Sequence, residues 1–215
     1  REINRTPQKT LIICNHVATS QTVWEILNKE YHISSRLLHA RFNGRDRAEI
    51  EKAITGKNPP PVLVSTQAIE VSLNLDYDVG FTEPAPVDAL GQRFGRVNRK
   101  GLHESPAPVI IFEQTSGDFP IYDENLTRRT TDLLSKVDCF TERQLVDIVN
   151  EVYCNGYQNK AKEDFTKGRT HPIISNFDEQ IVAGTHHPWV LDVIRASDGQ
   201  IEVLPHNLTT EYAEL

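Results

Sequence analysis

The residues best suited to chemistry lie in one short stretch, Gln-Arg-Phe-Gly-Arg-Val-Asn-Arg, at 92–99. In a helix, Gln92, Arg96 and Arg99 follow the i, i+4, i+7 spacing and share one face. Arginine presents a planar fork of donors that fits phosphate oxygens, and two arginines at one place suit the charge that develops on a transferring γ-phosphoryl group. The alternative is an ordinary solvated helix whose arginines pair with nearby acids, and the helix by itself favours that alternative.

The opposite face of that helix carries Leu90, Phe94 and Val97, which can pack on a sheet. Arg96 and Arg99 are therefore expected to point away from the core. Replacing either arginine should change the free energy of unfolding by no more than about 0.5 kcal/mol, as surface substitutions usually do.

Short apolar runs alternate with helical patterns on both sides of this stretch. In chain order, we expect a strand at 11–14, a helix through 23–27, a strand at 36–39, a helix at 46–54, strands at 62–65 and 79–82, a helix at 87–97 and a strand at 109–112. This alternation predicts an α/β fold, in which a parallel sheet with flanking helices is buried on both faces. Ligands of such sheets bind beyond the carboxyl ends of the strands, so the residues that follow each strand are candidates for contact.

The pattern changes after residue 113. Residues 114–170 are expected to be a mostly helical linker, and 171–215 the start of an accessory region with a β-hairpin at 189–204. The expected features of the linker are, in order, a helix over 126–137, a capping box at Thr141 and Gln144 that opens a second helix, Gly156 at the end of that helix, and a polar loop over 157–170.

Composition excludes several classes of protein. With 215 residues, of which 38% are hydrophobic and 25% charged, the chain can bury a sizeable core, and wholesale disorder is not expected. No apolar run approaches the ~20 residues that cross a membrane, and the three cysteines, Cys14, Cys139 and Cys154, lack the spacing of a zinc ribbon. We expect a cytoplasmic protein with no membrane partner. The absence of methionine predicts that the chain is a piece of a longer protein.

Charge is distributed unevenly along the chain, whose formal net charge is −7. Residues 1–110 carry 14 Lys and Arg against 12 Asp and Glu, whereas residues 111–215 carry 9 against 18. The first part can meet phosphates locally, and the second is expected to be a solvated acidic appendage.

Three ordered motifs resemble those of superfamily 2 helicases. Residues 92–99 match the Q-R-x-G-R-x-x-R motif that closes the second RecA-like domain of those enzymes. Residues 65–73 resemble the preceding motif, in which a threonine hydroxyl and nearby backbone N–H groups hold a nucleic-acid phosphate. Residues 38–42, followed by 45–47, resemble the strand-to-helix motif of the same family.

The runs at 66–78 and 82–90 narrow the resemblance to the helicase of type I CRISPR systems, over residues 10–112. The resemblance implies that residues 5–113 form a second, C-terminal RecA-like domain. It also implies an ATP-dependent single-stranded DNA translocase of antiviral defence, which works with an HD nuclease domain or subunit and with the CRISPR surveillance complex. ATP would lie in the cleft to a first RecA-like domain, which would supply the phosphate loop, the Mg²⁺ ligands and the catalytic acid.

The resemblance assigns roles to single residues as well. Arg96 and Arg99 would contact the nucleotide as catalytic groups, and Gln92 would couple the state of the nucleotide to the nucleic-acid side. Asn74 stands where relatives usually carry an aspartate near the ribose, although an amide can still form a hydrogen bond there. Contacts with the DNA backbone are expected from residues that follow strands, which are Asn15, His16, Arg41, Thr66 and Gln67.

Several alternatives stay open. Thr66 can instead cap the turn that follows it, and Arg41 can pair with nearby acids. The chain can belong to another superfamily 2 helicase that acts on DNA or RNA, or be a non-catalytic, helicase-like module that only docks a partner. An attached or neighbouring HD domain would favour the CRISPR role, whereas the intact set of Gln92, Arg96 and Arg99 speaks against a docking module.

The sequence also lacks parts of an ATPase. It contains no phosphate loop of the form G-x-x-x-x-G-K-[ST]. His171, His186 and His187 lack accompanying cysteine or acidic ligands, so no metal site is expected in this chain. The chain therefore resembles half of an ATPase.

The isolated chain is expected to hydrolyse no ATP above background, because it lacks the phosphate loop that binds the triphosphate. A phosphate-release assay on the purified chain checks this expectation. Turnover that disappears in an Arg96→Ala control would contradict the interpretation of the chain as half of a site.

Overall fold

The computed structural model describes residues 8–70, 73–102, 105–117, 119–156 and 159–170. They belong to two compact units, Arg1–Asn155 and Gly156–Leu215. The first unit contains the sheet, and the described part of the second contains the helix α6 (Asn159–Arg169).

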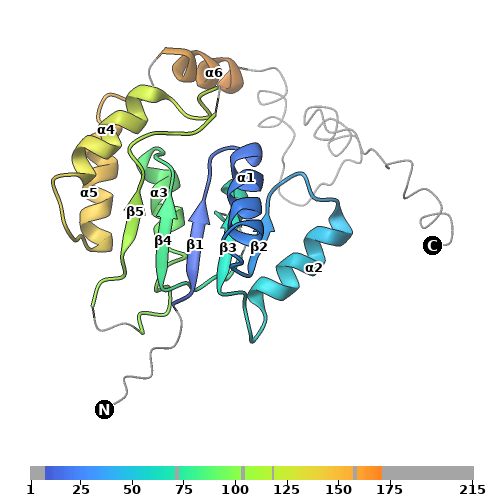
Figure 1. Cartoon of the computed structure of the whole chain (residues 1–215). Coiled ribbons are helices and arrows are strands. Elements are labelled where there is room, and N and C mark those ends of the chain that lie inside the picture. The colour runs from blue at the N-terminus through green and yellow to red at the C-terminus, as the bar shows by residue number, and fades with distance from the viewer. Residues whose placement is uncertain (1–7, 71–72, 103–104, 118, 157–158, 171–215) are drawn as a thin grey trace, which may run out of the picture. The chain divides into compact units, whose positions relative to one another are not determined.

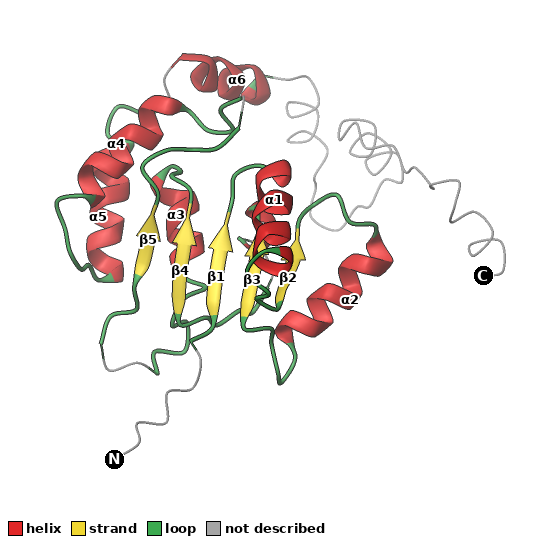
Figure 2. Cartoon of the chain, in the orientation of Figure 1, coloured by secondary structure: helices red, strands yellow, loops and turns green. Residues whose placement is uncertain are grey.

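Within the described residues, five parallel strands form one sheet in the order β2-β3-β1-β4-β5 (Figure 2). Their bounds are β1 (Thr10–Ile13), β2 (Ser35–Leu38), β3 (Val62–Ser65), β4 (Val79–Thr82) and β5 (Val109–Ile111). Ile13 is in register with both Ser65 and Thr82, so three strands end at the same edge of the sheet. The predicted parallel α/β sheet is confirmed, and the residues that follow these strands meet at that edge.

Helices flank this sheet, and Figure 1 shows α1 in front of it and α3 behind it. The bounds are α1 (Val17–Lys29), α2 (Gly44–Thr55), the one-turn 3-10 helix η1 (Gln67–Ile69), α3 (Val87–Phe94), α4 (Glu124–Leu134) and α5 (Glu142–Val152). Leu11 and Ile13 of β1 point to one side of the pleat, where Ile50 and Ile54 of α2 complete the core. In the described part of the chain, no helix has the length and apolarity needed to span a bilayer.

The helix α3 ends at Phe94, earlier than the predicted end at Val97. After this point the chain turns toward the start of β4, where Val97 pairs with Tyr77. The Tyr77 N–H donates to the Arg96 carbonyl (3.0 Å), and the Asn98 N–H donates to the Tyr77 carbonyl (2.7 Å). Asn98 has a φ of 45°, which asparagine tolerates better than most residues do. Tertiary pairing therefore overrides the helical pattern of the sequence.

Helices α4 and α5 pack on α3 and belong to the unit of the sheet. They lie in the stretch for which the sequence predicts a mostly helical linker. Their shared core joins Leu90 of α3, Leu134 of α4 and Ile148 of α5. The predicted capping box is confirmed, because the Thr141 hydroxyl accepts the Gln144 N–H and the Gln144 side chain accepts the Thr141 N–H.

In the second unit, α6 occupies a stretch for which the sequence predicts a polar loop. That prediction is wrong, because the Lys, Ala and Glu residues of this stretch are strong helix formers even though they build no apolar face. The hairpin predicted at 189–204 lies outside the described residues, as do His171, His186 and His187.

Leu134→Ala should lower the free energy of unfolding of the sheet unit by about 2–5 kcal/mol, because it removes a buried side chain from the core that α3, α4 and α5 share. Urea unfolding followed by circular dichroism measures the change. Leu102→Ala is the control, since Leu102 is 77% exposed and its loss should change the value by no more than about 0.5 kcal/mol. An unchanged transition in Leu134→Ala would show that α4 is no part of that core.

Candidate nucleotide and nucleic-acid site

The side chain at the centre of the site is Arg93, which reasoning from the sequence did not select. It lies near the end of α3 and is 1% exposed. Long helical side chains lean toward the helix N-terminus, so its guanidinium extends back to the carboxyl-end edge of the sheet. Its Nε donates to Glu70 Oε1 (2.9 Å), its Nη1 to the Thr82 hydroxyl (2.8 Å) and the Glu83 carbonyl (3.1 Å), and its Nη2 to Asn15 Oδ1 (3.0 Å) and the Tyr122 hydroxyl (3.0 Å).

These contacts use all the N–H donors that a guanidinium has. A buried guanidinium needs them, because an unpaired charge or donor away from water is strongly destabilising. The Glu70 carboxylate balances the charge of Arg93 in an ion pair whose side chains are 12% and 0% exposed. Arg93 therefore ties the ends of β1 and β4 to the turn after β3 and to the residues after β5.

Glu83, directly after β4, is a second buried charge. Its carboxylate accepts the backbone N–H groups of Asn15 and Ser116, the latter at 2.6 Å, and also the Ser116 hydroxyl. The loop that follows β5 is thereby fixed on the carboxyl ends of β1 and β4. The sequence interpretation missed this role, although an acidic residue directly after a buried strand is a signal for that edge of the sheet.

Arg96 is buried, with 8% exposed, and does not lie on an open helix face. Its Nε donates to the Ile69 carbonyl (2.9 Å) and its Nη2 to the Glu70 carbonyl (2.6 Å). The expectation that Arg96 can be removed at little cost in stability is therefore wrong, since the turn at 66–70 would lose two hydrogen bonds. The early end of α3 is the cause. Burial and then the charge of Arg99 lower the pKa of Arg96 from its ordinary value, yet a guanidinium keeps its proton at neutral pH.

Gln92, Arg99 and Asn74 are exposed, which leaves them accessible to a ligand or a partner domain. The Arg99 Nη1 donates to the Gly95 carbonyl (3.1 Å), a local contact at the end of α3. Within the described ranges, no group of three or more His, Cys, Asp or Glu side chains is arranged to hold a metal ion.

Thr66, Gln67 and Asn15 lie together where β3 and β1 end. The Gln67 side-chain amide donates to the Asn15 carbonyl (3.0 Å). Thr66 is buried and its side chain does not cap η1, so the capping alternative is not observed. Asn15 uses both ends of its own amide within the protein, since Oδ1 accepts from Arg93 and Nδ2 donates to the Pro84 carbonyl (2.9 Å). The Asn15 side chain is therefore occupied in the fold rather than presented to a ligand.

His16 and Arg41 follow β1 and β2, two positions apart in the sheet. His16 is half-buried beside Gly117, where a φ of 132° favours glycine and an added Cβ would approach the His16 ring to 2.5 Å. Arg41 is exposed, and its N–H donates to His39 Nδ1 (3.2 Å). Burial lowers the pKa of His39, which stacks on Phe42 at 4.3 Å between ring centroids.

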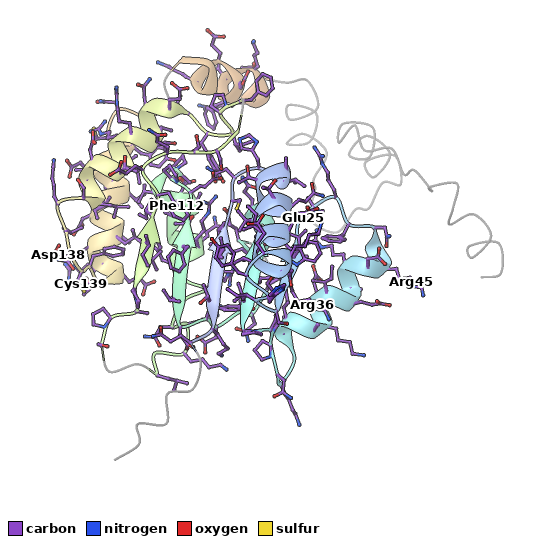
Figure 3. All side chains as sticks on the ribbon, viewed as in Figure 1. Glu25, Arg36, Arg45, Phe112, Asp138 and Cys139 are labelled. Atoms are coloured by element: carbon purple, nitrogen blue, oxygen red, sulfur yellow. The ribbon has the colours of Figure 1, made fainter. Side chains whose placement is uncertain are left out.

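Charged side chains differ between the two edges of the sheet. Figure 3 shows Arg36 of β2 and Arg45 of α2 near the β2 edge, and Asp138, which follows α4, near the β5 edge. Arg41 follows β2 and so adds to the first group. Arg45 and Arg47 of α2 each pair with a glutamate of the same helix, Glu49 at 3.9 Å and Glu51 at 2.7 Å, so these charges are balanced locally.

The three arginines of this motif should differ in their effect on stability. Arg93→Ala should lower the free energy of unfolding by about 3–5 kcal/mol, because it leaves a buried carboxylate unpaired. Arg96→Ala should lower it by about 1–3 kcal/mol through the two lost hydrogen bonds, and the exposed Arg99→Ala by no more than about 0.5 kcal/mol. Urea unfolding of the three variants measures the order.

If Arg93→Ala does not fold, Arg93→Lys takes its place, because lysine keeps the charge and loses the fork of donors. A value for Arg96→Ala equal to that for Arg99→Ala would contradict the buried, hydrogen-bonded position of Arg96.

The sequence has relatives over this region. Residues 6–102 match the sequence profile of the family described as CRISPR-associated nuclease/helicase Cas3, C-terminal. The chain is 46% identical over 79 residues to the CRISPR-associated endonuclease/helicase Cas3 of Thermus thermophilus, and 34% identical over 109 residues to that of Escherichia coli. These alignments cover 34% and 46% of this chain, but only 8% and 12% of the two relatives.

Solved structures with a similar fold include two of T. fusca Cas3. The chain matches the Cas3-ADP crystal structure with a TM-score of 0.62 at 25% identity, and the Cas3-ATP crystal structure with a TM-score of 0.61 at 27% identity. The matches cover 79% and 78% of this chain and 23% of each T. fusca chain. Profile, relatives and fold agree, and together they support a C-terminal, RecA-like helicase domain of the Cas3 type over residues 6–102.

Proposed function

We propose that this chain supplies the second RecA-like half of an ATP-dependent, single-stranded DNA translocase that acts in type I CRISPR interference. In support, the relatives are named CRISPR-associated endonucleases/helicases, and the two T. fusca structures carry ATP and ADP in their names. A first RecA-like domain would supply the phosphate loop, the Mg²⁺ ligands and the catalytic acid. An HD nuclease domain or subunit and the CRISPR surveillance complex would be further partners.

The proposal depends on one observation. The turn at 66–70 contacts both the proposed DNA side and the proposed ATP side of the site. At its start, Thr66 and Gln67 lie at the carboxyl-end edge, and Gln67 is bonded to the end of β1. At its end, two carbonyls accept hydrogen bonds from Arg96. A single turn can therefore transmit the presence of DNA to the arginines of the ATP side.

On the DNA side, Thr66 and the backbone N–H groups after β3 would hold a phosphate without reading the bases, as a translocase requires. His16 and Arg41 would extend this contact along the ends of the strands. The Asn15 side chain has no direct part in it, because its amide is bonded to Arg93 and Pro84.

On the ATP side, Arg99 would reach the γ-phosphoryl group across the cleft to the first RecA-like domain. Arg96 would complete the pair, since it precedes Arg99 by three residues in the chain that follows α3. Gln92 is exposed on the helix that leads to both arginines and would couple them to the DNA side. Asn74 is exposed and would approach the ribose.

Arg99→Ala in the full-length protein should lower the DNA-stimulated ATPase rate by about 10³-fold, the effect of losing an arginine finger, while single-strand affinity stays unchanged. Thr66→Ala should do the reverse and weaken single-strand binding by about tenfold, because one hydrogen bond to a charged phosphate is lost. Coupled ATPase assays and fluorescence anisotropy measure the two quantities.

Arg143→Ala is the matched control for Arg99→Ala, because Arg143 is an exposed arginine of α5 and should affect neither quantity. Equal loss of DNA binding in Arg99→Ala and Thr66→Ala would contradict the proposed separation of roles. A full-length protein whose ATPase rate does not respond to single-stranded DNA would contradict the proposed function itself.

A further inference from the structure

We propose that Tyr122, in the segment that follows the sheet, is a positioning residue through which that segment holds the turn at 66–70 in the form that responds to DNA. The inference rests on the proposed function and extends it to a residue outside the 6–102 match. Tyr122 touches no nucleotide or DNA in this account. It acts through Arg93, Gln67 and the turn.

The contacts of Tyr122 lie at the centre of the site. Its hydroxyl accepts a hydrogen bond from Arg93 Nη2 (3.0 Å), and its ring lies 5.8 Å from the Arg93 guanidinium. Gln67, at the start of the turn, lies close enough to this side chain to influence the pKa of Tyr122, which burial raises. Tyr122 is therefore linked through Arg93 both to Asn15, after β1, and to Glu70, at the end of the turn.

The path from Tyr122 to the ATP side is short and consists of charged contacts. Arg93 Nε donates to the Glu70 carboxylate (2.9 Å), and the Glu70 carbonyl accepts from Arg96 Nη2 (2.6 Å). Loss of the Tyr122 hydroxyl would leave one buried Arg93 donor without its acceptor. The guanidinium would then shift toward its remaining partners and carry Glu70 with it, because a buried donor without a partner is unfavourable.

The position of Tyr122 is itself fixed by the segment around it. Ser116 is bonded to the buried Glu83 carboxylate, and the Thr19 hydroxyl of α1 donates to the Ser116 carbonyl (3.4 Å). The next residue, Asp123, accepts the N–H groups that open α4. Tyr122 is therefore held between the strand ends and the start of α4.

Tyr122→Phe in the full-length protein tests the inference, because it removes one hydroxyl and keeps the ring over Arg93. We expect the ratio of ATPase rates with and without saturating single-stranded DNA to fall about tenfold, which corresponds to about 1.4 kcal/mol. The rate without DNA and the affinity for single-stranded DNA should stay unchanged. Both rates, the affinity and the melting temperature are measured on the same preparation.

Tyr153→Phe is the matched control. The Tyr153 hydroxyl also forms a hydrogen bond to a charged group, since it donates to Asp88 Oδ1 (2.7 Å), but Asp88 is none of the five acceptors of Arg93. The control should leave the DNA-stimulated ratio unchanged.

Three results would overturn the inference. The first is an unchanged DNA-stimulated ratio in Tyr122→Phe, and the second is an equal fall of that ratio in Tyr153→Phe. The third is an equal fall of the ATPase rates with and without DNA in Tyr122→Phe, because a merely structural role would lower both rates together. Absence of DNA stimulation in the unmodified protein would instead contradict the proposed function, and this inference would fall with it.

Discussion

The geometry of this site depends on one buried guanidinium, that of Arg93. A positive charge at that place is stable only because each of its donors has an acceptor, and the acceptors come from segments far apart in the sequence. The requirement accounts for the side-chain types that surround it, which are Asn15, Glu70, Thr82 and Tyr122. The ends of β1 and β4, the turn after β3 and the loop after β5 are therefore held in one arrangement.

Two arginines of one motif hold the same turn in different ways. Arg93 binds the side chain of Glu70, whereas Arg96 binds main-chain carbonyls of the turn. The first contact ties the turn to the strand ends and the second ties it to the chain that leads to Arg99. The turn is therefore fixed at two points, through a side chain by Arg93 and through the main chain by Arg96.

Much of the sheet could be predicted from the sequence, because each strand is a short apolar run with its own local boundaries, and β3 and β4 lie at the predicted residues. The partners of Arg93 could not, since Glu70 and Asn15 are 23 and 78 residues away along the chain. A helical wheel assumes that the helix continues through Val97. The structure departs from this assumption, because Val97 pairs with Tyr77 and α3 has already ended. Local patterns therefore identified the motif but not which of its arginines is buried.

Hydrogen exchange of the backbone amides in the turn at 66–70 tests most directly whether the hydrogen bonds of the Arg93 guanidinium hold this turn in place. In Arg93→Lys, which keeps the charge, the amides of Ile69 and Glu70 should exchange about tenfold faster than in the unmodified protein. The amides of Leu63 and Val64, in the centre of β3, should keep their rates. Unchanged exchange in the turn, or equal acceleration in the turn and in β3, would contradict the account.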